Sequence, residues 1–257
     1  MNSELQKIIE HENAHWGEIF KTECEKNNDK NFSSFWWEDY YNELSLHVNK
    51  LVDSNNLKTI LEAGSGSGKA TILLDKKISK TLLDVSPNAL KYAKKIANKL
   101  GGGDINFVEG NIFSMLFKDE NFDLVWNIGV VEHYELENVK SIIGEMIRVC
   151  SKSGIVAVGL PNFHSGPMVK ARLLKKVKFI PGYKIDTEKF YSIEALNDIF
   201  RNVSKDMGRN IAYIKTECFG NPMFMETPKF LLKIVGGLVS RIFKNNKFLI
   251  LIICKFE

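Results

Sequence analysis

A glycine-rich loop constrains the fold of this chain more than any other feature of its sequence. The segment 59–71 reads TILEAGSGSGKAT, so an apolar strand runs into three glycines at alternate positions and then into a helix. Glycine is needed where a backbone turns sharply or approaches a ligand with no Cβ in the way. The helix N-terminus adds free N–H groups and a partial positive charge. The segment therefore predicts a strand–loop–helix unit suited to a carboxylate, a ribose or a phosphate.

Three classes of binding loop use this device, and the spacing of the residues separates them. A P-loop requires Gly-Lys followed by Ser or Thr, but Ala70 stands where the Mg²⁺-binding hydroxyl belongs. A dinucleotide loop requires GxGxxG, and counting from Gly64 places Lys69 at the third glycine. The pattern that matches throughout is acidic-x-Gly-x-Gly-x-Gly, which runs from Glu62 to Gly68.

This pattern resembles motif I of the class I S-adenosylmethionine (SAM)-dependent methyltransferases, and the resemblance covers roughly residues 57–161. In that family an acidic residue at the end of the second strand binds the ribose hydroxyls, and Asp84 matches it. The family's usual Gly-Asp after the third strand reads Gly110-Asn111 here, and the Asn111 carbonyl can still accept from the adenine amino group. The segment 122–134 is similar to the family's hydrophobic strand followed by Glu-His.

The resemblance implies SAM as the cofactor and a set of residues that bind it. These are Glu62, Gly64, Ser65, Gly66, Gly68, Asp84, Val85, Asn111, Ile112, Asn127 and Ile128, the last two contacting the methionine part through backbone groups. His133 is the candidate catalytic base, because imidazole can take a proton from an acceptor hydroxyl or amine near neutral pH. Alternatively, His133 lines the pocket without titrating. We expect Glu132 to cap a helix or face solvent.

Aromatic residues before the first strand support two interpretations. Trp37 and Tyr41 share one face of a predicted helix, and Tyr40 lies on the neighbouring face. In one interpretation these rings dock the helix onto the domain. In the other, Trp37, Tyr40 and Tyr41, together with Tyr134, form a lid that closes over SAM and its substrate and excludes water.

Short β-rich runs alternate with helical patterns in the middle of the chain, which is typical of a parallel sheet covered on both faces. Together with the resemblance, this predicts an α/β, Rossmann-like, doubly wound, seven-stranded, mostly parallel sheet with an antiparallel last strand. The expected strands are 58–63, 80–85, 105–109, 122–127, 154–160, 210–218 and 247–256, and the expected helices include 87–100, 136–150 and 192–203. Residues 1–56 are expected to form an N-terminal helical extension or lid, and residues 57–257 the methyltransferase domain.

Composition narrows the class of protein. Of the 257 residues 44% are hydrophobic and 26% are charged, which supports a sizeable buried core and excludes wholesale disorder. The four cysteines lie far apart without CxxC spacing, so we expect reduced thiols, no metal site and a cytoplasmic location. No window approaches the roughly 18 apolar residues of a membrane span, and the N-terminus lacks the pattern of a secretory signal.

Basic residues concentrate in the final third of the chain. Residues 162–257 hold 17 basic and 8 acidic side chains, whereas residues 1–56 hold 5 and 11. Two expected cap insertions, at about 162–190 and 220–246, contain stretches with basic residues and no acids, namely 162–185 and 227–247. They are either ordinary solvated surface or a cap that attracts an acidic acceptor or rests on an anionic surface. The segment 228–244 has the pattern of an amphipathic basic helix.

The sequence thus predicts methyl transfer to oxygen or nitrogen of a small, anionic, phosphorylated or sugar-linked metabolite. One alternative is a lipid or quinone precursor at a membrane surface, with peripheral membrane contact. A second is a non-catalytic SAM-binding regulatory domain. We do not expect a nucleic-acid substrate, because no Asn-Pro-Pro-Tyr-like or Asp-Pro-Pro-Tyr-like segment follows the fourth strand. These patterns do not determine the identity of the acceptor or the oligomeric state.

Overall fold

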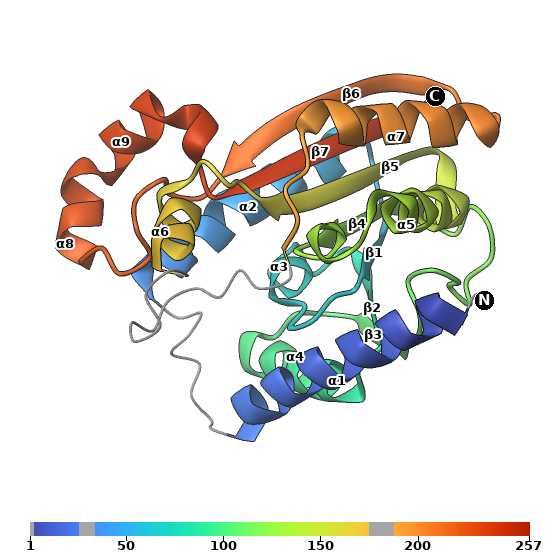
Figure 1. Cartoon of the computed structure of the whole chain (residues 1–257), viewed down its shortest axis with the longest axis horizontal. Coiled ribbons are helices and arrows are strands. Elements are labelled where there is room, and N and C mark those ends of the chain that lie inside the picture. Colours follow the sequence, from blue (N-terminus) through green and yellow to red (C-terminus); the bar gives the residue numbers. More distant parts are fainter. Residues whose placement is uncertain (1–2, 26–33, 175–187) are drawn as a thin grey trace.

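A mixed β-sheet with helices on both faces organises the chain (Figure 1). The computed structural model describes residues 3–25, 34–174 and 188–257. The strands are β1 (Thr59–Ala63), β2 (Ser79–Asp84), β3 (Ile105–Glu109), β4 (Phe122–Ile128), β5 (Cys150–Pro161), β6 (Ile211–Phe219) and β7 (Leu249–Phe256). Their order is β3-β2-β1-β4-β5-β7-β6. In this sheet β7 is antiparallel to both of its neighbours, β5 and β6, and the other neighbouring pairs are parallel. The predicted Rossmann-like sheet of seven strands is confirmed.

The helices follow the predicted pattern closely in the middle of the chain. They are α1 (Ser3–Glu25), α2 (Phe35–Ser54), α3 (Lys69–Ile72), α4 (Pro87–Leu100), α5 (Leu136–Val149), α6 (Gly166–Leu174), α7 (Ile193–Asp206), α8 (Lys229–Leu231) and α9 (Gly237–Ile242). Ser86 caps α4 by accepting from the Ala89 N–H, Pro87 begins the helix, and Gly101 ends it at φ 66°. The basic segment 162–185 is described only to Leu174, and Lys175, Lys176, Lys178 and Lys184 lie outside the described residues.

Helix α2 belongs to the core of the domain. Trp36 and Tyr40 are almost fully buried, and both rings pack edge-on against Phe248 with centroids 5.2 and 5.7 Å apart. The Trp36 indole N–H donates to the Met223 carbonyl at 3.0 Å, so burial leaves no unpaired donor there. Residues 1–56 were expected to form an extension outside the domain. That expectation does not hold for α2, because its apolar side chains pack in the same core cluster as residues of the sheet.

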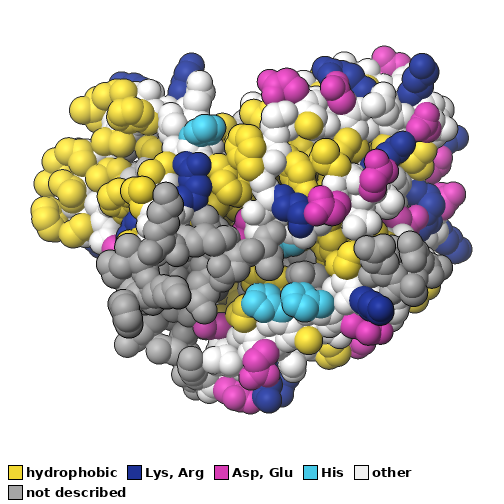
Figure 2. Space-filling view, in the orientation of Figure 1, with side chains coloured by type: hydrophobic (Ala, Val, Ile, Leu, Met, Phe, Trp, Pro, Cys, Tyr) yellow, Lys and Arg dark blue, Asp and Glu magenta, His cyan; other side chains and the backbone are white. Residues whose placement is uncertain are grey.

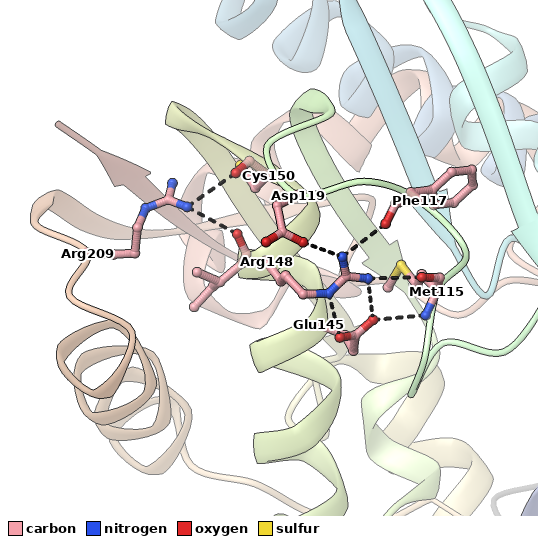
Figure 3. Close-up of polar contacts among 8 residues, drawn as sticks. Met115, Phe117, Asp119, Glu145, Arg148, Cys150 and Arg209 are labelled. Carbon is pink, nitrogen blue, oxygen red and sulfur yellow. Dashed lines mark hydrogen bonds and ion pairs between the residues drawn. The ribbon is translucent and has the colours of Figure 1, made fainter.

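Arg148 fastens the β3–β4 connection to α5 (Figure 3). Its guanidinium donates to the carboxylates of Glu145 and Asp119 at 2.7–2.8 Å. It also donates to the carbonyls of Met115 and Phe117, each at 2.9 Å, while Glu145 accepts from the Met115 N–H. A planar fork of donors is required to reach two carboxylates and two carbonyls at once. Arg148 thus holds the connection that follows β3 in one position.

Arg148→Lys should lower the free energy of unfolding by about 2–3 kcal/mol, because an ammonium cannot make these bonds together and leaves carbonyls unpaired. Urea denaturation measures the change. Arg201→Lys is the matched control, since Arg201 pairs with Asp198 at 3.0 Å on the exposed side of α7 and should change stability by at most about 0.5 kcal/mol. Equal effects of the two substitutions would contradict the assignment.

Candidate functional site

A cavity lies at the carboxyl ends of β1, β2 and β4. Strands β2 and β3 lie on one side of β1 and β4 and β5 on the other, so the strand order changes direction at β1. Ligands of open α/β sheets bind at this kind of position. The cavity has a volume of about 210 Å³. Its wall consists of Ile9, Trp16, Phe20, Gly64, Ser65, Gly66, Ser67, Asp84, Val85, Gly110, Asn111, Ile112, Ile128, Gly129, Val130, His133 and Tyr134.

The glycine loop forms the floor of this cavity, and its backbone explains why it needs glycine. Gly64 and Gly66 have φ angles of 75° and 52°, in the left-handed region that L side chains rarely adopt. A Cβ on Gly64 would lie 2.9 Å from the side chain of Val130, and one on Gly66 would lie 2.9 Å from the ring of Phe20. Any side chain at these positions would therefore occupy space in the cavity or displace its wall.

Asp84 connects the end of β2 to the glycine loop. One carboxylate oxygen accepts from the Gly66 N–H and the other from the Ser86 N–H, each at 2.8 Å. Burial raises the pKa of Asp84, and these backbone hydrogen bonds oppose the rise by favouring the carboxylate. Each oxygen has a second lone pair, so the group can still accept from hydroxyls of a ligand in the cavity.

Eight of the eleven residues predicted to bind the cofactor lie on the cavity wall, namely Gly64, Ser65, Gly66, Asp84, Val85, Asn111, Ile112 and Ile128. Asn111 Oδ1 accepts from the Phe113 N–H at 2.9 Å, so local structure already orients this side chain. The apolar side chains of Val85 and Ile112 can flank a flat ring, and the loop backbone can approach a charged chain. This donor set fits a nucleoside attached to a short polar chain.

Glu62, Gly68 and Asn127 do not reach the wall. Glu62 is buried beneath the loop and hydrogen-bonds Thr71 of α3, and burial raises the pKa of Glu62 to about 7. Asn127 is fully buried beside Met146, with its Nδ2 3.3 Å from the sulfur. Neither Glu62 Oε2 nor Asn127 Oδ1 has a hydrogen-bond partner among the described residues. None of the three lies on the cavity wall, so their contact with a cofactor stays a prediction.

Helix α1, and not α2, supplies the aromatic cover of the cavity. Trp37 and Tyr40 lie in the core, and Tyr41 lies on the far side of the loop, where the Lys69 ammonium is 4.7 Å from its ring centroid. The predicted lid of Trp37, Tyr40 and Tyr41 is thus corrected. Trp16 and Phe20, one helical turn apart on α1, line the cavity instead. The sequence contains this aromatic pair, but its spacing does not say which surface it covers.

His133 lies on the wall as predicted, and its ring meets Trp16 edge-on with centroids 5.4 Å apart. The predicted lid residue Tyr134 also lies on the wall, and its carbonyl accepts from the Tyr191 hydroxyl. The Lys189 N–H donates to the Glu132 carbonyl at 2.6 Å. The segment that precedes α7 therefore packs on the loop that carries His133.

Glu132 is not the capping or solvent residue expected from the sequence, because its side chain is 1% exposed. Burial, reinforced by the nearby charge of Glu188, raises the pKa of Glu132 to about 8. Its Oε1 would lie 3.7 Å from a Cβ on Gly129, which lines the cavity. A protonated carboxyl group therefore lies directly behind the cavity wall at neutral pH.

The pKa of Glu132 predicts a pH-dependent stability. The folded chain holds a proton that the unfolded chain, with a pKa near 4.5, has lost. The contribution of this group is therefore lost as the pH rises from about 5 through about 8. Relative to Glu132→Gln, the wild type should lose on the order of a few kcal/mol of unfolding free energy across this window.

Chemical denaturation at several pH values measures this difference. The exposed Glu137 of α5 offers a matched control, since the difference between wild type and Glu137→Gln should stay flat over the same range. If the unfolding free energies of the wild type and of Glu132→Gln change in parallel at all pH values, Glu132 is ionised in the folded chain.

The described residues contain no group of three or more His, Cys, Asp or Glu side chains that could hold a metal ion. Within the same residues, no helix is long and apolar enough to span a membrane.

Comparison with known proteins places this site in context. Residues 54–215 match a family model described as a methyltransferase domain. An uncharacterised protein of Methanocaldococcus jannaschii is 28% identical over 219 residues, which are 82% of this chain and 84% of that protein. Ajmaline N-methyltransferase of Rauvolfia serpentina is 31% identical over 110 residues, 42% of this chain and 37% of that enzyme. A solved SAM-dependent methyltransferase of Thermotoga maritima shares the fold with a TM-score of 0.60 at 17% identity, covering 95% and 99% of the two chains.

Proposed function

Because the chain belongs to the methyltransferase domain family and uses SAM as its methyl donor, we propose that the cavity described above binds SAM beside the methyl acceptor. SAM supplies a methyl group on a sulfonium that is already a good leaving group. The observation that carries the proposal is the link from Asp84 to the Gly66 N–H, which places a carboxylate and an open glycine backbone on one wall.

The residues of the wall have distinct roles in this proposal. Asp84 accepts from the ribose hydroxyls, Val85 and Ile112 flank the adenine, and Asn111 accepts from its amino group. The loop of Gly64 and Gly66 leaves room for the methionine part. Alignment and exclusion of water by the aromatic rings of α1 account for much of the catalysis, since methyl transfer requires in-line approach at short range. His133 is the group on the wall that can accept the acceptor's proton.

For the acceptor we propose a small nucleophile that reacts through oxygen or nitrogen. A soluble anionic metabolite is one candidate, because the final third of the chain is basic. However, none of the described basic residues of 162–185 and 227–247 lines the cavity. Lys170 and Lys247 instead pair with Glu226 and Glu43, and Arg172 donates to a backbone carbonyl.

The second candidate is a lipid or quinone precursor, and a specific observation favours it. The helix that carries Lys229, Lys233 and Arg241, and that ends just before Lys244, exposes a row of large apolar side chains. An amphiphilic acceptor could contact both the cations and the apolar row of this helix, whereas a soluble anion could contact the cations alone. We therefore propose an amphiphilic acceptor over a soluble one, and turnover of SAM with acceptors of both kinds separates them.

The proposed location is the cytoplasm.

Gly66→Val should abolish SAM binding, because its side chain would enter the cavity from a left-handed backbone position. Isothermal titration calorimetry measures the affinity, and thermal unfolding checks the fold. Gly208→Val is the matched control, since Gly208 has a φ of 65° with no atom within 4 Å of its Cβ position. It carries the same backbone strain far from the site and should bind SAM normally. Wild-type affinity in Gly66→Val would remove the central assignment.

Asp84→Ala should weaken SAM binding by about 2–3 kcal/mol, the scale of charge-assisted hydrogen bonds. The same calorimetry applies, with Glu109→Ala as the control, because this exposed carboxylate ends the neighbouring strand β3. If both substitutions have the same small effect, Asp84 does not contact the ribose.

A further inference from the structure

We propose that the helix from Lys229 to Ile242 docks this protein onto an anionic lipid surface. The helix consists of α8, a π-helical turn at Leu232–Gly236 and α9, which follow one another without a break. This inference goes beyond methyl transfer and does not depend on the identity of the acceptor.

One side of this helix carries an uninterrupted apolar row. Phe230, Ile234, Leu238 and Ile242 recur at every fourth position and are 65%, 74%, 60% and 63% exposed. Phe243 follows them and is 51% exposed. Figure 2 shows hydrophobic side chains gathered at the end of the molecule where Figure 1 places α8 and α9. Single exposed apolar residues are ordinary, but a continuous row of five marks an interaction surface.

The opposite side of the helix anchors it to the domain and fixes the direction of the row. Leu232 and Gly236 are buried, and Leu232 belongs to the core cluster that contains Trp36. A Cβ on Gly236 would lie 3.0 Å from the amide nitrogen of Asn221, so the backbone packs closely there. The helix therefore cannot rotate to bury its apolar row. The wider π turn also lessens the angular drift of residues spaced by four, which keeps the row on one side.

Cations flank the apolar row. Lys229, Lys233, Arg241 and Lys244 are exposed, and residues 227–247 contain no acidic side chain. Lys229 and Lys233 lie over the ring of Phe35, at 5.0 and 5.7 Å from its centroid. The four make no ion pair with the described residues, while Glu226, the preceding acid, already pairs with Lys170 at 2.5 Å. An apolar ridge with cationic flanks is complementary to the interface of an anionic bilayer.

A second copy of this chain fits the surface less well. A two-fold contact would place the same patch on both sides, and the cations of one copy would face those of the other. The helix also projects as a ridge at the end of the molecule (Figure 1). A ridge inserts readily into a soft lipid interface, whereas a protein partner would have to provide a matching groove.

Docking through this helix would also orient the cavity. The helix follows the carboxyl end of β6, and β6 is parallel to β5 and hence to β1 and β4, because both β5 and β6 run antiparallel to β7. The helix and the cavity therefore lie at the same edge of the sheet. A lipid surface that receives the helix would therefore lie toward this edge of the sheet.

Vesicle sedimentation of the full chain tests the proposal. The probes are phosphatidylcholine vesicles with and without phosphatidylserine, at low and at raised salt. The wild type should sediment with the anionic vesicles and lose binding on addition of salt. Ile234→Glu combined with Leu238→Glu should reduce the bound fraction by about tenfold or more. Leu46→Glu combined with Leu116→Glu is the matched control, because these leucines are 63% and 87% exposed on other elements. It should bind like the wild type.

Two further measurements separate the outcomes. Calorimetry with SAM and thermal unfolding should give wild-type values for the Ile234→Glu, Leu238→Glu variant, so that loss of lipid binding is distinct from loss of the fold or of the cofactor site. Replacing Lys229, Lys233, Arg241 and Lys244 with Gln should remove the preference for phosphatidylserine. The proposal is wrong if the wild type does not sediment with anionic vesicles. It is also wrong if the glutamate variant binds them unchanged, or if the row proves to mediate self-association or capture of a protein instead.

Discussion

The hydrogen bond from the Gly66 N–H to Asp84 is the interaction on which the site depends. It joins the loop after β1 to the end of β2, while the other oxygen of Asp84 holds the Ser86 N–H just before α4. The glycine loop, the end of β2 and the start of α4 therefore meet at one carboxylate. Because the loop adopts left-handed backbone angles, this bond also stabilises a conformation that an isolated peptide would rarely populate.

Support for that carboxylate comes from groups that do not touch the cavity. Glu62 binds Thr71 beneath the loop, and Arg148 fixes the β3–β4 connection on the opposite side. Glu132 lies behind Gly129 with a raised pKa. The hydrogen bonds of Glu62 and Arg148 restrict the positions of the segments that they join. Residues outside the cavity wall thus help to fix the positions of the residues that form it.

The described basic residues of the final third of the chain do not line the cavity. Among the described residues of 162–185 and 227–247, the basic side chains form ion pairs, donate to a backbone carbonyl or lie along and just after the helix of α8 and α9, and none lines the cavity. The aromatic rings that cover the cavity come from α1. Substitutions on the cavity wall and substitutions on the helix of α8 and α9 can therefore alter acceptor binding and surface binding separately.

The sequence by itself predicted the alternation of strands and helices and the glycine loop, because these depend on local hydrophobic spacing and on backbone angles that glycine tolerates. Its resemblance to the methyltransferase family pointed to Asp84 and His133. Only the tertiary structure decided which aromatic residues cover the cavity, why Glu132 is buried and which face of the helix at 229–242 points outward. Helical periodicity defines the faces of a helix but not what each face meets. That choice depends on packing between segments far apart in the chain, such as Trp16 against His133 and Leu232 in the core beside Trp36.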